Sequence, residues 1–166
     1  GANGIQALDL VGRKMAQSYG RLLRRFFHPV QKFIEDNAAD EGAQEFIMHL
    51  AKAFAKLQQA TGMIAQKGLK NADEAGAASS DYLRQFALVA MAYMWCRIVL
   101  VAQAKLKSGE GDPSSQSSAG HGKAFFEAKI KTARFFMERV LPEADARFKM
   151  VMAGAPSMMA MTEGEF

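Results

Sequence analysis

The sequence predicts an all-α protein, an antiparallel helical bundle of about four to five main helices. Hydrophobic residues make up 49% of the 166 positions and only four residues are proline. Apolar side chains recur at helical spacing rather than in the alternation of a half-buried strand. Residues with high helix propensity, such as Ala, Leu, Met, Gln, Lys and Glu, dominate the composition. A chain of this length buries roughly two thirds of its unfolded surface, so we expect one compact core.

Two helices are predicted in the first third of the chain. The first runs from about residue 4 to residue 17, with apolar positions Ile5, Leu8, Val11 and Met15. Gly20 is expected to break it. A second apolar stripe follows between residues 22 and 34, and Pro29 lies inside it. Because proline lacks an N–H and clashes with the preceding turn, we expect it either to kink this helix or to sit in the first turn of a new one.

The middle of the chain predicts two longer helices. After a polar turn at residues 37–42, in which Asp40 is the expected N-cap, a third helix continues to about Lys70. Its apolar face consists of Phe46, Ile47, Leu50, Phe54, Leu57 and Ile64. The segment from Ser80 to Lys107 is the longest apolar element. It nearly has the length of a transmembrane helix, but Arg97 near its centre would cost about 2.5 to 3.5 kcal/mol there.

We therefore expect this segment to be a soluble core helix and not a membrane span. The other helices are amphipathic and need a partner, and a central helix that they surround is apolar on all sides for that reason. Arg97 must then find a buried acceptor or reach the edge of the bundle.

A loop and two further helices are predicted in the last third. Residues 108–122 contain almost no apolar side chain, which predicts a flexible loop. The helical period returns at Lys123, with an apolar face of Phe126, Ile130, Ala133, Met137 and Val140. Pro142 suits the first turn of a short final helix, which residues 154–156 should stop. Its inward positions should be Phe148, Val151 and Met152, and the Met-rich residues 158–161 should pack on the bundle.

The charge pattern and the single cysteine limit the classes of function. The net charge is +4, and basic residues are mostly interleaved with acidic ones. The exception is a group formed by Arg21, Arg24, Arg25 and Lys32. We interpret it as a solvated helix face, with contact to a phosphate of CoA or nucleic acid as the alternative, although no nucleic-acid motif accompanies it. Cys96 has apolar neighbours and is expected to be a buried thiol in a reducing compartment. With no basic and apolar leader visible, the expected location is the cytoplasm.

No self-contained active site is predicted. Three histidines lie in different segments, and Glu45 with His49 is one helical pair, far short of a di-iron ligand set. Cys96 has no histidine nearby in the sequence, and the serines form no nucleophile-elbow pattern. We therefore expect no metal site and no catalytic residue. The turn at residues 1–4 carries two glycines and leads into a helix, so its backbone N–H groups and the helix dipole would attract an anion.

Two segments together resemble the acyl-CoA dehydrogenases. Residues 1–13, GANGIQALDLVGR, resemble the stretch after the catalytic glutamate of that family, where a Glu-Gly-Thr-x-x-Ile-Gln run leads into a helix. Residues 129–142, KIKTARFFMERVLP, resemble the C-terminal helical extension of its long members, a subgroup that includes enzymes acting on 3-methylthiopropanoyl-CoA. The resemblance is most specific in residues 1–14 and 123–166.

The resemblance implies that this chain is the C-terminal part of an FAD-dependent acyl-CoA dehydrogenase. Residues 1–18 would be the last helix of the catalytic helical domain, and residues 19–166 an accessory helical bundle. The catalytic glutamate would immediately precede Gly1, so the fragment itself would be structural and inactive. By position, Gly1 would lie beside the acyl-CoA substrate. The expected FAD-binding residues are Ala2, Asn3, Gly4 and Gln6, although Ala2 departs from the family's threonine and so lacks one hydroxyl contact.

The resemblance also implies partners. These are the upstream catalytic domains, acyl-CoA, an electron-transfer acceptor and further copies in a homo-oligomer, with no nucleic acid and no membrane span. From the residues alone, a second class stays open, a stand-alone helical protein-interaction module whose exposed Phe and Met side chains bind a partner. Both hypotheses, the enzyme fragment and the interaction module, predict exposed apolar surface. A third, a basic nucleic-acid binder, predicts salt-sensitive binding to any duplex.

Overall fold

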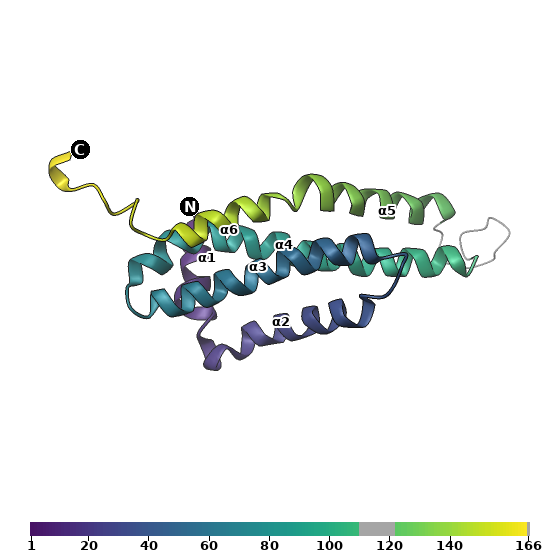
Figure 1. Ribbon diagram of the computed structural model, residues 1–166, viewed down its shortest axis with the longest axis horizontal. Coiled ribbons are helices and arrows are strands. Elements are labelled where there is room, and N and C mark those ends of the chain that lie inside the picture. The colour runs from purple at the N-terminus through teal and green to yellow at the C-terminus, as the bar shows by residue number, and fades with distance from the viewer. Residues whose placement is uncertain (110–121, 166) are drawn as a thin grey trace.

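The computed structural model describes residues 1–109 and 122–165. Five helices of eleven or more residues form the bundle, and the eight-residue helix α1 (Ala2–Asp9) precedes them (Figure 1). The five are α2 (Gln17–Asn37), α3 (Gln44–Gly68), α4 (Ala72–Lys107), α5 (Lys123–Phe135) and α6 (Glu143–Ala153). No strand occurs in these two stretches. The predicted all-α class and the number of main helices are confirmed.

Short irregular helical segments connect or follow these helices. A π-helical stretch, Leu10–Lys14, follows α1, and a second one, Phe136–Val140, joins α5 to α6. Helices α5 and α6 therefore run along one side of the bundle as nearly one rod (Figure 1). A short 3-10 turn, Glu163–Glu165, lies in the extended tail beyond α6.

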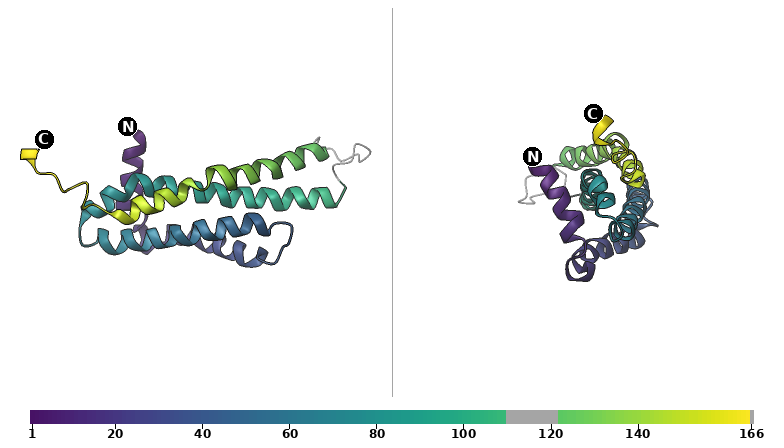
Figure 2. Two further views of the ribbon diagram at one scale, coloured as in Figure 1. Left: turned by 45° about the horizontal axis from the view of Figure 1, so that its top comes forward. Right: turned by 90° about the vertical axis from the view of Figure 1, so that its left-hand side faces the viewer.

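Helix α4 is the centre of the arrangement, as the sequence predicts. It packs against α3, α5, α6 and α1. In the end-on view of Figure 2, helices α2, α3, α6 and α5 form an arc around α4, and α1 lies on the opposite, open side. The side of α4 away from the arc is thus covered by α1 over part of its length.

The core consists of the apolar faces that the helical periods predict. The large side chains with less than 2% exposure include Phe46, Leu50, Phe54, Leu57, Tyr82, Leu88, Met137 and Val151. Every predicted inward position of α3 is buried. Aromatic contacts join α2 to this core, with the Phe27 and Phe54 ring centroids 5.2 Å apart in an edge-on arrangement.

The entry into α2 confirms the predicted joint at Gly20. Ser18, Tyr19 and Gly20 have φ values of 52°, 55° and 72°, which is left-handed backbone between two right-handed helices. Pro29 lies inside α2, where no residue after Gly20 departs from helical φ and ψ. The alternative in which Pro29 starts a new helix is therefore wrong. Val30, the residue after Pro29, is fully buried.

Two helix starts differ from the predictions. Ala43, not Asp40, is the N-cap residue of α3. The Asp40 carboxylate accepts hydrogen bonds from the N–H groups of Gly42 (2.9 Å) and Ala43 (3.2 Å), so it closes the turn just before the helix. Helix α4 begins at Ala72, eight residues before the predicted Ser80. Asn71 caps it by accepting from the N–H of Asp73 at 3.0 Å.

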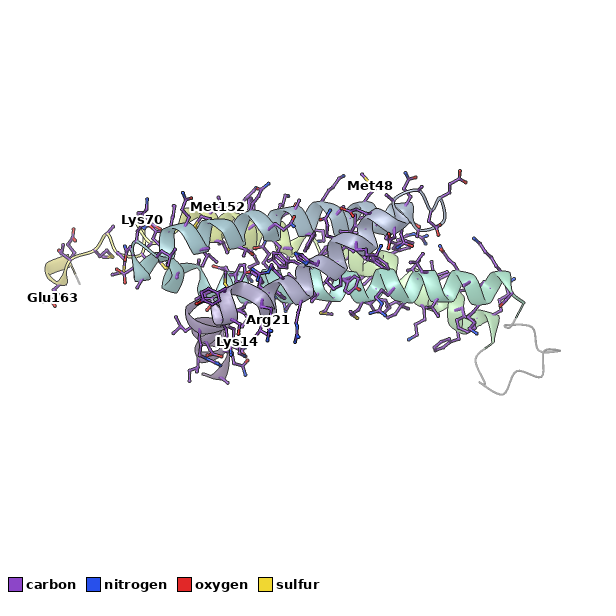
Figure 3. All side chains as sticks on the ribbon, turned by 90° about the horizontal axis from the view of Figure 1, so that it is seen from below. Lys14, Arg21, Met48, Lys70, Met152 and Glu163 are labelled. Atoms are coloured by element: carbon purple, nitrogen blue, oxygen red, sulfur yellow. The ribbon has the colours of Figure 1, made fainter. Side chains whose placement is uncertain are left out.

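The C-terminal part is partly as predicted. Pro142 is the N-cap of α6 and Gly154 ends that helix, while Val151 is buried and Phe148 is half-buried. Met152 is 40% exposed and lies on the outside of the bundle (Figure 3), so the prediction that it faces inward is wrong. It directly follows Val151, and one residue is about 100° of helical rotation. The methionines at positions 158, 159 and 161 are also exposed, not packed. The predicted flexible loop lies, for residues 110–121, outside the described residues.

Helix α4 is not covered on all sides, contrary to the expectation. Only 39% of its most apolar 18-residue window is buried. Within the described ranges it is the one helix whose length and composition would allow it to cross a membrane, but the core helix of a soluble protein has the same properties. Arg97 is exposed, and its guanidinium carbon lies 5.6 Å from the centroid of the Tyr93 ring. It reaches the edge of the bundle, one of the two predicted alternatives.

Candidate functional site

The five residues that the sequence singles out for ligand binding lie at the start of α1. Gly1, Ala2, Asn3, Gly4 and Gln6 are all exposed. Gly1 is the N-cap and contributes no side-chain hydrogen bond. The first intrahelical bond of the helix is donated by the Ile5 N–H to the Gly1 carbonyl, at 3.4 Å. Because the first N–H groups of a helix have no intrahelical acceptor, those of Ala2, Asn3 and Gly4 are available to an anion or a polar ligand.

One hollow connects this turn to the bundle. It has a volume of about 350 Å³, and Asn3 lines it together with residues of α4 and α6. The other lining residues are Ser80, Leu83, Arg84, Ala87 and Arg147. The fold thus brings Asn3 near two arginines that are more than 80 positions away along the chain. No pattern in the sequence indicates that these two arginines lie beside Asn3.

Both arginines are already engaged by carboxylates. Arg84 donates to Glu143 through Nε and Nη2, at 3.0 and 2.7 Å, and this bond joins α4 to α6. Arg147 donates to Glu143 at 3.0 and 3.1 Å and to Asp81 at 2.8 Å. The pairs across α4 and α6 are 59 and 66 residues apart in sequence. Helical spacing therefore gave no signal for them.

The electrostatics of this cluster are nearly balanced. Hydrogen bonds and charge interactions with Arg84, and then with Arg147, lower the pKa of Glu143 to about 2. Two arginines thus face two carboxylates, Glu143 and Asp81, which leaves little net charge. A phosphate beside Asn3 would therefore be attracted mainly by the N–H groups and dipole of α1 and not by these guanidinium groups.

The described residues contain no group of three or more His, Cys, Asp or Glu side chains that would hold a metal ion. Glu45 accepts from Arg134 on α5 at 2.6 and 3.1 Å, so its carboxylate is bound to an arginine and not paired with His49 for a metal.

Cys96 is buried, as predicted, and its thiol donates to the Phe46 carbonyl at 3.5 Å. Burial raises the pKa of Cys96 to about 12, which leaves the thiol protonated and a poor nucleophile.

A larger apolar cavity, of about 590 Å³, lies where the α1–α2 junction meets the end of α3 and the start of α4. Leu8, Met15, Ile64 and Leu69 are among its walls, and Thr61 provides a hydroxyl. That hydroxyl is already hydrogen bonded to the Leu57 carbonyl and to the Tyr82 hydroxyl, both at 2.7 Å. The cavity therefore offers apolar contact and little else. Its walls come from segments far apart in the sequence, so no local pattern predicts it.

Comparisons with known proteins relate this arrangement to a family. A family model described as acetyl-CoA dehydrogenase C-terminal like matches residues 26–162, which contain most of α2 and all of α3 to α6. The chain is also similar to the 3-methylmercaptopropionyl-CoA dehydrogenase of Ruegeria pomeroyi, with 29% identity over 167 aligned positions. That similarity covers 96% of this chain and 25% of the relative, so the chain spans about a quarter of the relative's length.

Proposed function

The chain belongs to the acetyl-CoA dehydrogenase C-terminal-like family, and on this premise we propose that it is the C-terminal helical part of an FAD-dependent acyl-CoA dehydrogenase. The observation that carries the proposal is the match of nearly the whole chain to a quarter of a relative that is named 3-methylmercaptopropionyl-CoA dehydrogenase. The parent protein would oxidise the α,β-bond of an acyl-CoA thioester. This region would add structure to that enzyme and not chemistry.

The proposed division of the parent is at residue 18. Residues 1–18 would complete the catalytic helical domain, and residues 19–166 would form the accessory bundle. Two features support this boundary. The left-handed turn at Ser18–Gly20 separates α1 from the rest. Ile5 and Leu8 on α1 are 72% and 54% exposed, which suits a helix whose apolar side chains pack against another domain.

The start of α1 offers groups that would suit FAD and acyl-CoA, which supports this proposal. The proposed FAD contacts are the free N–H groups of Ala2, Asn3 and Gly4 and the exposed side-chain amide of Gln6, while Gly1 would lie beside the acyl-CoA. N–H groups at a helix start suit a pyrophosphate. FAD, when bound, would accept the hydride from the substrate β-carbon. The proton from the α-carbon would go to a glutamate that precedes Gly1 in the parent.

The bundle itself would be inactive when separated from the parent. It would contribute neither the base, which we place before Gly1, nor, in its described part, a buried ionisable group directed at the start of α1. We propose that it covers the active-site region or a subunit contact of a homo-oligomer. The proposed location is the cytoplasm, and an electron-transfer acceptor would reoxidise the flavin.

Acyl-CoA-dependent bleaching of the flavin in the parent protein, followed with a dye acceptor, tests this proposal. The matched control changes the glutamate before Gly1 to glutamine, which keeps the size of the side chain but removes the base. Bleaching in the parent and none in the glutamine variant is the expected result. A parent that binds no flavin and turns over no acyl-CoA would contradict the proposal.

A stand-alone interaction module is the second candidate, because large apolar side chains are exposed on several helices. Examples are Met94 on α4 at 45%, Phe135 on α5 at 60% and Met150 on α6 at 51%. Under this candidate the natural gene product would contain no flavin-binding region and would still bind a protein partner. The mass and absorbance spectrum of the protein isolated from its own cells separate the two.

A further inference from the structure

One face of α4 has apolar side chains that the other described helices leave partly exposed. Met91, Met94, Ile98 and Val101 are 49%, 45%, 38% and 58% exposed. Together with the exposed Ala87 they are spaced 4, 3, 4 and 3 residues apart, which is the repeat of a helix–helix seam. We call these five residues the open face of α4. Its width and spacing fit one partner helix.

The open face is also hollowed. A groove of about 520 Å³ lies between α4 and the start of α5, where Phe125 and Phe126 form its second wall. A smaller hollow of about 290 Å³ continues it toward Met91. Met94 and Ile98 line both, so the two form one continuous apolar track along α4. Such a track receives the ridge of side chains of a second helix.

The charges around the track are of one sign. Arg97 and Lys129 line it, and the described lining contains no carboxylate. Each cation already lies near an aromatic ring, Arg97 over Tyr93 and Lys129 at 4.9 Å from the Phe125 centroid. If a second copy of the chain bound this face around a two-fold axis, Arg97 and Lys129 of the two copies would approach one another and repel. A partner helix with acidic side chains beside its apolar stripe is complementary.

The position of α1 indicates where that partner comes from. Asn3 at the start of α1 lies across a hollow from Ser80, Leu83 and Ala87, so α1 crosses the same side of α4, next to the open face. In Figure 2 this is the side that the arc of the other helices leaves open. Under the proposed function, the catalytic body is joined to α1 and stands on this side.

We propose that the open face of α4 is the docking surface for an amphipathic helix of the catalytic body of the same polypeptide, one whose apolar stripe is flanked by carboxylates. This inference rests on the proposed function, because it takes its occupant from the parent dehydrogenase. The track between α4 and α5 receives the apolar side chains, and Arg97 and Lys129 pair with the carboxylates. The accessory bundle is thus held to the catalytic body by its own central helix.

Cysteine labelling tests this surface. The native Cys96 is only 1% exposed, so it should not react in the folded protein and the label reports on the introduced cysteine alone. Met94→Cys reports on the open face. Met48→Cys on α3 is the matched control, since the two methionines are 45% and 50% exposed. Both variants are treated with a maleimide in this chain alone and in the full-length parent, and labelled peptides are quantified by mass spectrometry.

In this chain alone, both cysteines should be labelled at similar rates. In the parent, labelling at position 94 should slow by at least about tenfold while position 48 is unchanged. Equal rates at position 94 in both proteins would overturn the proposal. So would protection that grows with the concentration of this chain alone, which indicates a second copy, or protection that needs anionic vesicles, which indicates a lipid surface. A parent that protects position 94 but shows no flavin bleaching would refute the proposed function and leave the docking surface intact.

Discussion

Replacing Gln85 by methionine should make the protein more stable. Gln85 is fully buried on α4 among Tyr82, Leu88 and Val89, which are also buried. Neither its side-chain oxygen nor its nitrogen has a hydrogen-bond partner in the described part of the protein. Methionine has a similar length and volume but no polar group that needs a partner, so it should occupy the same space without the desolvation cost.

The size of the effect follows from the two polar atoms. A buried donor or acceptor without a partner costs about 1 to 3 kcal/mol. Replacing the amide removes this cost, but imperfect packing of the methionine offsets part of the improvement. We therefore expect the free energy of unfolding to rise by about 1 to 2 kcal/mol. For a chain of 166 residues this corresponds to an increase in Tm of about 2 to 8 °C.

Urea unfolding followed by circular dichroism, with a thermal scan in parallel, measures this change. Gln58→Met is the matched control, because Gln58 is exposed on α3 and its replacement should stay within about 0.5 kcal/mol of the parent chain. A loss of more than about 1 kcal/mol in Gln85→Met, with Gln58→Met unchanged, would refute the reasoning. It would mean that the amide is hydrogen bonded in solution and contributes to stability.

Three other predictions follow from the same structure. Gly154→Ala should lower the free energy of unfolding by about 1 to 3 kcal/mol, because its φ of 68° and ψ of −157° suit only glycine and the new Cβ would also displace the end of the Glu74 side chain. Gly62→Ala, at an open position on α3, should be neutral or slightly stabilising in the same urea titration. The lowered pKa of Glu143 means that its ion pairs stabilise the fold fully above about pH 4.5 and that this stability is lost as the pH falls toward about 2. Glu143→Gln should therefore reduce the loss of unfolding free energy over that range by about 1 kcal/mol, the scale of a partly exposed ion pair, and the fall of Tm with pH should be flatter. Cys96 should not react with a thiol reagent at pH 8 in the folded protein and should react fully in urea; fast reaction without urea would contradict its burial.

The parts of the fold that the sequence predicted correctly are those set by local periodicity. The inward face of α3 follows the spacing of Phe46, Leu50, Phe54 and Leu57, and all are buried. The joint at Gly20 follows from a residue type that tolerates positive φ. The start of α4 was missed because residues 72–79 contain mostly Ala, Ser and Gly. Small side chains pack closely between helices, but they do not form the stripe of large apolar residues at helical spacing by which a helix is predicted.

The candidate site, too, was predicted only where local sequence determines it. A helix start close to Gly1 was predicted from the glycines in the sequence, although α1 begins at Ala2 and not at about residue 4, so Asn3 and Gly4 are helical. The hollow beside it was not, because Asn3 meets Arg84 and Arg147 only through tertiary packing. The prediction that α4 is covered on all sides assumed that every apolar side chain of a helix finds its partner within this chain. Met91 and Val101 show that this assumption was wrong.

This exposure on the central helix has an energetic consequence. A self-contained bundle gains most when its most apolar helix is fully enclosed, since each Å² of apolar area removed from water stabilises by roughly 25 cal/mol. Here the open face of α4 and the apolar side chains Ile5 and Leu8 of α1 are left in water. Any partner that binds these surfaces only when the bundle is folded raises the stability of the bundle by mass action. When that partner is joined to α1, its effective concentration is high and a weak contact is sufficient. A modest apolar track can therefore serve as a permanent interface in the parent protein, although the same track would hold a separate partner only loosely.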